Sequence, residues 1–232
     1  MPRATFEGLT ALREQPAYPL HEAAKLARVA PATLRTWVLG RNYRTSAGSR
    51  HWPRLITPAD SRHCILSFNN LVEAHVLRAL RTIHGSEVRQ IRAALKYAAS
   101  ELEIDRLLLS EQLETNGGDI FLRKLGSLIN LSRSGQLALK EMLEKHLQRV
   151  LRDSSGFPIK LYPFVREDGG QARVIAIDPA IGFGRPIVAS KAISTQTIVD
   201  RIDSGEAPEA LAEDYGLHLS EITEAVVYER AA

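Results

Sequence analysis

Basic and aromatic side chains are concentrated in one polar stretch of the chain, residues 41–57, and this combination suits contact with phosphate groups. Gly48 and Pro53 lie within it, so we expect a loop or a small hairpin. Its candidate contact residues are Arg41, Tyr43, Arg44, Arg50, His51 and Arg54. Each phosphate that such residues neutralise steepens the salt dependence of binding. Any one of these arginines is equally well explained as a solvated loop charge, so the prediction depends on the whole group.

A second set of candidate contact residues lies just before this stretch. Thr33, Arg35 and Thr36 are hydroxylated or basic, and such side chains can reach base edges in a DNA groove. Leu34 and Trp37 alternate with them at helical spacing and suit an inner face. We expect Trp37 to anchor the core instead of stacking on a base.

No pattern in the sequence indicates catalysis or a bound metal ion. His63 and Cys64 are adjacent, whereas zinc ligands are usually spaced and come as two pairs. The local pattern suggests neither a Ser-His-Asp nor a Cys-His set. The sequence Gly182-Phe183-Gly184 lacks the remainder of a phosphate-binding loop. We therefore expect a protein that is not an enzyme and has no cofactor and no metal.

Two short helices must position the candidate contacts. Apolar spacing predicts helices over residues 20–27 and 31–39, the second opened by Pro31 and closed by Gly40. Two helices joined by so short a turn form the minimal unit that lays its second helix in a major groove. The polar stretch after them would be a wing.

The remainder of the chain alternates between helical and strand patterns. Ser67 is a candidate cap for a longer helix that continues to about residue 83. Gly85-Ser86 should end that helix before another at 88–102. Farther on, the predicted elements are strand-like residues 120–129, a turn at Ser134-Gly135, a helix at 137–152, a hairpin of 160–166 with 173–177, a connector at 178–184, and helices at 195–203, 208–215 and 221–230. Ser194 and Ser220 are candidate N-caps of the first and last of these helices.

These elements predict a fold that is mainly α with a smaller β component. The chain divides into a loose N-terminal arm (1–17), a winged helix-turn-helix domain (18–104), a middle α+β segment (105–177) and a small C-terminal three-helix domain (178–232).

Charge separates the two ends of the chain, although the net charge is only +3. Residues 1–100 contain 15 Lys or Arg and 6 Asp or Glu, a net of +9. Residues 200–232 contain 9 acidic and 2 basic residues, a net of −7. The basic end suits a polyanionic partner. The acidic end would repel phosphates and suits contact with protein.

Other features of composition favour a cytoplasmic protein. The single cysteine fits a reducing compartment. No run approaches the roughly 18 apolar residues that span a bilayer, and residues 1–7 include no apolar stretch of signal-peptide length. We therefore expect no membrane contact.

The sequence Tyr18-Pro19-Leu20-His21-Glu22-Ala23-Ala24-Lys25-Leu26-Ala27-Arg28-Val29-Ala30-Pro31-Ala32-Thr33-Leu34-Arg35-Thr36-Trp37 resembles the opening of a MerR-type winged helix-turn-helix. The resemblance implies that Arg35, Thr36 and the basic residues of the wing touch DNA. The wing here is longer and irregular, and no long dimerising coiled coil follows residue 102.

The C-terminal part, from about residue 174, resembles the small domain of VapB-type antitoxins. The resemblance is carried by Gly182-Phe183-Gly184-Arg185-Pro186-Ile187-Val188 and by Gly205-Glu206-Ala207-Pro208-Glu209-Ala210-Leu211. It implies a PIN-like ribonuclease toxin as partner, and autoregulation by a dimer on a two-fold operator in double-stranded DNA. Arg185 and Arg230 are the candidates for insertion among the carboxylates of the toxin's metal site, and a surface ion pair is the plain alternative.

The resulting hypothesis is an antitoxin of a type II toxin–antitoxin system that also represses its own operator. A first alternative is a free-standing MerR-like transcription regulator whose middle segment senses a small molecule. A second is an interaction protein whose basic half meets RNA or an acidic protein.

Overall fold

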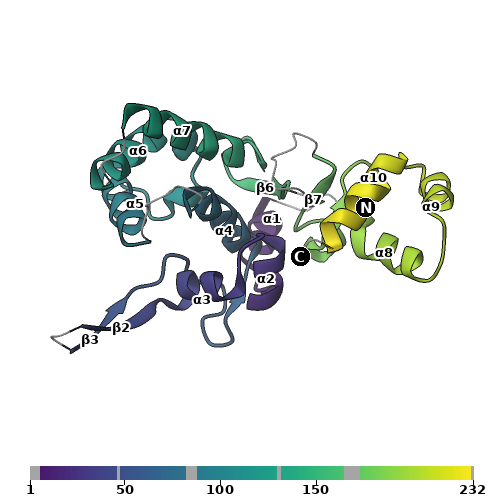
Figure 1. Cartoon of the computed structure of the whole chain (residues 1–232), viewed down its shortest axis with the longest axis horizontal. Helices are drawn as coiled ribbons and strands as arrows, with labels where there is room; N and C mark the ends of the chain where they lie inside the picture. The colour runs from purple at the N-terminus through teal and green to yellow at the C-terminus, as the bar shows by residue number, and fades with distance from the viewer. Residues whose placement is uncertain (1–5, 46–47, 82–87, 130–131, 165–172, 231–232) are drawn as a thin grey trace.

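A computed structural model describes residues 6–45, 48–81, 88–129, 132–164 and 173–230 of the chain. Helices dominate this part of the molecule, and its strands pair in antiparallel fashion. The molecule is elongated, with a hairpin projecting at one end and the C-terminal helices at the other (Figure 1). The predicted class, mainly α with a smaller β component, is confirmed.

The N-terminal part contains the two predicted short helices and the hairpin after them. Its elements are α1 (Phe6–Glu14), β1 (Tyr18–Pro19), α2 (Leu20–Leu26), α3 (Pro31–Leu39), β2 (Arg41–Thr45), β3 (Gly48–Trp52), β4 (Ile65–Leu66), α4 (Phe68–Arg81) and α5 (Val88–Leu102). Pro31 occupies the first turn of α3, where its missing N–H is not needed. The Ser67 hydroxyl accepts the Asn70 N–H (3.2 Å), as a cap does. The predicted break at Gly85-Ser86 lies outside the described residues.

The prediction of a loose arm over residues 1–17 is wrong for residues 6–14, which form α1. Arg13 fixes this helix: it is buried, and its Nη2 atom lies 2.7 Å from the Asp153 carboxylate. Glu14 accepts a hydrogen bond from Arg106 (2.6 Å). These partners lie 140 and 92 residues farther along the chain, so local periodicity contains no trace of them.

The middle segment is more helical than its pattern predicts. It contains the 3-10 turns η1 (Leu107–Leu109) and η2 (Glu111–Glu114), then α6 (Asn116–Leu128) and α7 (Arg133–Leu147). The strand prediction for residues 120–129 is therefore wrong. Gly117 and Gly118 precede residues 120–129 and lie in the first turn of α6, so they do not interrupt the helix. They allow close packing instead, because a Cβ on Gly118 would lie 2.2 Å from the Leu113 carbonyl oxygen. The turn predicted at Ser134-Gly135 is also wrong, since both residues lie in the first turn of α7, where Ser132 caps the Gly135 N–H (3.2 Å).

A meander of strands follows α7. It consists of β5 (Val150–Arg152), β6 (Pro158–Leu161), β7 (Ile175–Ile177), β8 (Pro186–Val188) and β9 (Ile193–Ser194), with η3 (Gly182–Gly184) between β7 and β8. The pairing of Leu161 with Ile177 confirms the predicted hairpin, whose connecting residues 165–172 lie outside the described part. The helix predicted over 137–152 instead ends at Leu147, and its last residues form β5.

The three predicted C-terminal helices are confirmed as α8 (Thr195–Asp203), α9 (Pro208–Tyr215) and α10 (Leu219–Arg230). Ser194 caps α8 by accepting the Thr197 N–H. Ser220 is not a cap, because it lies inside α10; the Glu221 carboxylate accepts the His218 N–H instead (2.9 Å). We refer to β7–β9 and α8–α10 together as the C-terminal unit. They share a hydrophobic core whose fully buried members include Ile175, Val188, Ile198, Leu211, Ile222 and Tyr228.

Short helix α2 joins the C-terminal unit to the remainder of the chain. The Arg28 guanidinium, just after α2, donates to the Tyr228 carbonyl and lies 4.3 Å from the centre of its ring. Lys25 forms an ion pair with Glu229 (3.0 Å), and Glu22 forms one with Arg185. The Tyr18 hydroxyl donates to the Gly184 carbonyl (2.9 Å). We call this set of contacts the α2 joint.

A buried pair of histidines lies where α4 meets α7. The His75 ring donates from Nε2 to the His146 carbonyl (3.1 Å), and the two imidazoles are 5.1 Å apart. Burial lowers the pKa of both, to about 4 for His146, and the nearby Arg78 and Arg149 act in the same direction. Phe164 covers both imidazoles, and Arg149 lies 4.4 Å from its ring centre. Both histidines are therefore neutral in the folded protein near pH 7.

Acidification should destabilise the protein through this pair. A histidine whose pKa is depressed by folding contributes stability above its unfolded pKa of about 6.5, and that contribution is lost as the pH falls toward the folded value. For His146 alone we expect the free energy of unfolding to fall by about 2 kcal/mol between pH 7.5 and pH 5. Urea unfolding across this range should show a shallower pH dependence for His146→Phe than for the wild type. The control His21→Phe, at an exposed position, should keep the full dependence; an unchanged slope in His146→Phe would contradict the assignment.

Loss of the Arg28 side chain should weaken the α2 joint. We expect Arg28→Ala to lower the free energy of unfolding by about 1–2 kcal/mol, since a hydrogen bond and a partly exposed cation–π contact both disappear. Arg28 has a φ of 55°, so Arg28→Gly should recover part of that loss by relieving the backbone. Urea unfolding measures both effects, with Arg62→Ala as a control at an exposed arginine. Equal stability of Arg28→Ala and Arg62→Ala would show that the contact contributes nothing.

Candidate functional site

Helices α2 and α3 pack against each other, and the predicted inner and outer faces of α3 are separated. Leu34, Trp37 and Val38 are buried, and Trp37 is 1% exposed, so it is the core anchor that the sequence predicts. Arg35 is exposed on the opposite side. The Thr36 hydroxyl donates to the Ala32 carbonyl (3.0 Å) within the helix, which leaves its oxygen able to accept only. Thr33 is half-buried and is also engaged in a polar interaction.

The hairpin β2–β3 lies within the residues where a wing was predicted, and we call this hairpin the wing. Its register divides the basic residues between two faces. Arg41 pairs with Trp52, and Asn42 pairs with His51. Because cross-strand partners share a face and neighbouring residues alternate, Arg41 and Tyr43 lie on one face and Arg44 lies on the other with His51. Both arginines are exposed. The side chain of Arg50, which the sequence places with them, lies outside the described part of the structure.

Contacts along the two faces make the wing a stiff element. The Tyr43 and Trp52 rings pack 4.6 Å apart on one face, and His51 bonds to Asn42 (2.7 Å) on the other. Gly40 permits the tight passage from α3 into β2: its φ is 76°, and a Cβ there would lie 2.3 Å from the Trp52 carbonyl oxygen. The wing thus follows α3 directly, with Trp52 close to the end of the helix.

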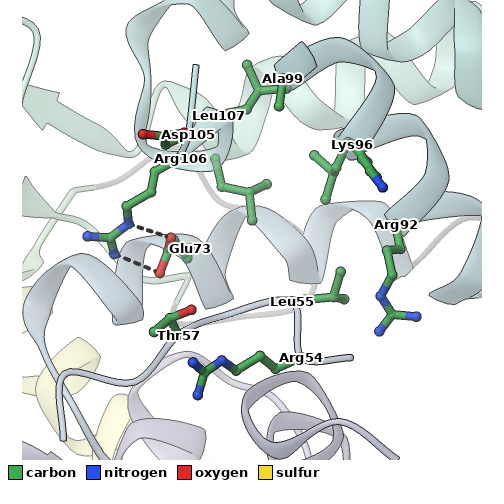
Figure 2. A pocket seen from close by; sticks show the side chains of 12 residues that line it. Arg54, Leu55, Thr57, Glu73, Arg92, Lys96, Ala99, Asp105, Arg106 and Leu107 are labelled. Carbon is green, nitrogen blue, oxygen red and sulfur yellow. Dashed lines mark hydrogen bonds and ion pairs between the residues drawn. The ribbon is translucent and has the colours of Figure 1, made fainter. Parts of the chain in front are cut away.

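Arg54 lies beyond the wing and belongs to a cavity. The segment after β3 is tied back to α3, since the N–H groups of Leu55 and Ile56 donate to the Trp37 carbonyl (2.7 and 3.1 Å). Figure 2 shows Arg54 and Arg92 on the wall of a cavity of about 250 Å³ between this segment and helices α4 and α5. The cavity is lined by Arg54, Leu55, Thr57, Glu73, Arg92, Leu95, Lys96, Ala99, Asp105, Arg106, Leu107 and Leu108. Of these residues, only Arg54 was predicted from the sequence to be a contact residue.

Some charged side chains of the cavity have a partner of opposite charge among the described residues, and Arg92 does not. Glu73 is held by two hydrogen bonds from Arg106 (both 3.0 Å), drawn as dashed lines in Figure 2, and burial still raises its pKa. Arg92 donates to the Pro53 carbonyl (2.6 Å), and its Nε atom is buried without a hydrogen-bond partner. Burial lowers the pKa of Arg92, as expected for a cation that lacks a carboxylate. With Lys96 and Arg54 also on the wall, the cavity can hold an anion.

The turn η3, between β7 and β8, contains Phe183, which was not predicted from the sequence to be a contact residue. Phe183 is the central residue of η3 and is 94% exposed, although Gly182-Phe183-Gly184 suggested only an incomplete glycine loop. The adjacent Arg185 is engaged with Glu22, so its charge is already matched. Arg230 pairs with Asp203 (2.8 Å). Both arginines predicted to contact a toxin are therefore ion-paired and half-exposed.

Within the described ranges, no three His, Cys, Asp or Glu side chains gather as a metal site would require. His63 bonds instead to the Asp60 carboxylate (2.7 Å). No helix in the described part of the chain is long and apolar enough to cross a membrane.

The C-terminal unit matches a known protein family, and the whole fold matches a solved structure. A family model described as a protein of unknown function, DUF433, matches residues 175–228, which run from β7 to near the end of α10. The crystal structure of Rv2018 from Mycobacterium tuberculosis superposes with a TM-score of 0.68 and 22% identity, covering 91% of this chain and 98% of that one. The two proteins therefore share a fold.

Two sequences from Mycobacterium tuberculosis are similar along most of their length. The uncharacterized protein Rv2308 is 25% identical over 234 residues, which is 95% of this chain and 92% of that protein. The candidate antitoxin VapB45 is 29% identical over 230 residues, which is 91% of this chain and 92% of that protein. The chain is thus antitoxin-like: over nearly its whole length it is similar to a protein named as a candidate antitoxin.

Proposed function

We propose that this chain is the antitoxin of a type II toxin–antitoxin pair, which binds operator DNA through α3 and the wing and neutralises a PIN-like ribonuclease through its C-terminal unit. The observation that carries the proposal is the separation of charge along an antitoxin-like chain. Arg35 on α3 and Arg41 and Arg44 on β2 are exposed. The hairpin β2–β3 projects at one end of the molecule, and the acidic helices α8–α10 lie at the other (Figure 1).

The proposed DNA contact divides into two parts. The exposed face of α3, with Arg35 and the Thr33 and Thr36 hydroxyls, would enter the major groove. The wing would lie along the backbone, where Arg41 or Arg44 neutralises a phosphate, according to which face meets the duplex. Tyr43, His51 and the neighbouring Arg50 and Arg54 would add contacts at its rim. A dimer would place two such units on a two-fold operator.

The proposed toxin contact belongs to the C-terminal unit because its helices are acidic and would repel nucleic acid. Either Arg185 or Arg230 could enter a carboxylate-lined metal pocket only by leaving its present carboxylate partner. For Arg185 that partner is Glu22 on α2, so toxin binding through this residue would also open one contact of the α2 joint.

Co-expression of the full chain with the product of the adjacent open reading frame tests the proposal. A retained complex with suppressed ribonuclease activity is the expected result. A gel shift with the chain's own promoter tests the DNA-binding half separately. If no partner is retained, the proposed antitoxin function is wrong, even when the chain binds the promoter.

Substitutions in the wing should act mainly through phosphate contact. We expect Arg44→Ala to weaken binding to all duplexes alike and to reduce the slope of log Kd against log salt by about 1. Arg35→Ala should instead reduce discrimination between the promoter and an unrelated duplex, by a factor of about 10 or more if it contacts a base. Fluorescence anisotropy at several salt concentrations measures both, with Arg123→Ala on α6 as an exposed control. If Arg44→Ala and Arg123→Ala behave alike, this face of the wing does not touch DNA.

The cavity beside Arg54 supports a second candidate function, a stand-alone transcription regulator that senses a small anion. A carboxylate or phosphate held by Arg92 and Arg54 would touch the segment that is hydrogen-bonded to the end of α3, and could thereby shift the wing.

Promoter binding with and without small acids distinguishes this regulator from the antitoxin. With inorganic phosphate and benzoate as probes, a regulator predicts a change in promoter affinity that is lost in Arg92→Gln. The matched control Arg89→Gln, at an exposed position on the same helix, should keep that response. No response to any probe, together with a retained nuclease, favours the antitoxin.

A further inference from the structure

Phe183 is far more exposed than other large apolar side chains. Among the described residues, the remaining exposed large apolar side chains have between 37% and 59% of their surface accessible, and Phe183 has 94%. A phenyl ring that is almost fully in water contributes nothing to the core. Its presence there calls for another explanation.

The backbone at Phe183 is unfavourable for phenylalanine. Its φ and ψ are 55° and 31°, in the left-handed region, where a bulky side chain clashes with its own backbone. Gly182 and Gly184 on either side also have positive φ values (57° and 73°). Glycine or asparagine would satisfy this turn at lower energy. A strained, exposed residue of this kind is a reasonable candidate for function.

Hydrogen bonds hold the backbone of the turn in place. Backbone hydrogen bonds run from Ile181 to Asp178 and from Gly184 to Ile181 (both 3.0 Å). The Tyr18 hydroxyl donates to the Gly184 carbonyl and lies so near that a Cβ on Gly184 would be 2.1 Å from it. Arg185, the next residue, is ion-paired with Glu22. Because the turn is already ordered, little conformational entropy remains to be lost on binding.

We propose that Phe183 is the anchor by which the C-terminal unit docks on its partner nuclease, inserting its ring into an apolar pocket of that protein. The inference rests on the proposed antitoxin function and names the residue that makes the contact. Exposed aromatic side chains that become buried at the centre of an interface contribute disproportionately to affinity. The matched family segment, residues 175–228, contains the whole turn.

A different protein fits this ring better than a second copy of the chain. A two-fold interface needs one surface patch that is complementary to itself, and the exposed neighbours of Phe183 in the turn, Ala180 and Gly182, are small. A head-to-tail contact would need an apolar pocket elsewhere on the chain. The cavity described above has six charged side chains on its wall and would not accept a phenyl ring. We therefore place the apolar pocket on the partner.

The substitution Phe183→Asn separates binding from folding. Asparagine tolerates the left-handed conformation, so the variant should unfold at the same temperature as the wild type or about 2–4 °C higher. Its Kd for the purified nuclease should be at least about 30-fold weaker, the factor that corresponds to a hot-spot residue of about 2 kcal/mol. Leu137→Gln is the matched control, since Leu137 is 59% exposed on α7, and it should leave the Kd unchanged.

Calorimetric titration of the full-length chains with the nuclease encoded beside them gives the Kd, and thermal unfolding gives the stability. If the wild type and Phe183→Asn bind the nuclease with the same Kd, the proposed role of Phe183 is wrong and the antitoxin function remains supported. A wild-type chain that does not bind the nuclease would overturn both. A wild-type dimer that dissociates in Phe183→Asn, with nuclease binding unchanged, would assign the ring to a second copy of the chain.

Discussion

Helix α2 is held from two sides, and the arrangement of the whole molecule depends on this. One side of the helix packs Ala23, Ala24 and Leu26 against the core. The other side carries Glu22 and Lys25, which are three residues apart and so share a face. Arg28 follows just after the helix, and all three residues bind the C-terminal unit. With seven residues α2 is too short to be stable alone, so its position is set by what it touches. Helix α3 packs directly on α2, and a shift of the C-terminal unit would therefore reach the proposed recognition helix through a single rigid piece.

The sequence predicts α2, α3 and the C-terminal helices better than α1 and the middle segment, for physical reasons. Helix α3 is marked by Pro31 and Gly40, α8 by Ser194 and α9 by Gly216, and the effects of these residues are local. Helix α6 was predicted as a strand because its glycine pair resembles a break. In the fold those glycines allow a neighbouring turn to approach closely, and that contact is invisible in a local window. Helix α1 was missed because its anchors, Asp153 and Arg106, are remote in sequence.

The same distinction applies to the candidate site. The basic group on α3 and the wing could be named from composition and spacing, since both arise from neighbouring residues. The division of Arg41 and Arg44 between opposite faces depends on the hairpin register. Arg92 and Lys96 became candidates only when α5 was brought against the segment after the wing. The only local signal at Phe183 was its two flanking glycines, which were interpreted as an incomplete phosphate-binding loop. The exposure of the phenyl ring depends on the fold and could not be predicted from the sequence.

The meander of strands has a consequence for how the C-terminal unit can exist in other chains. The matched family segment begins at residue 175, the first residue of β7, whereas β6 at residues 158–161 covers the outer side of that strand here. A polypeptide that consisted of the matched segment alone would expose β7 as an open edge, with unpaired backbone groups ready to pair with any extended chain. A chain that contained the unit without β6 would need another cover for that edge, such as a loop, a charged side chain or a strand from a second molecule.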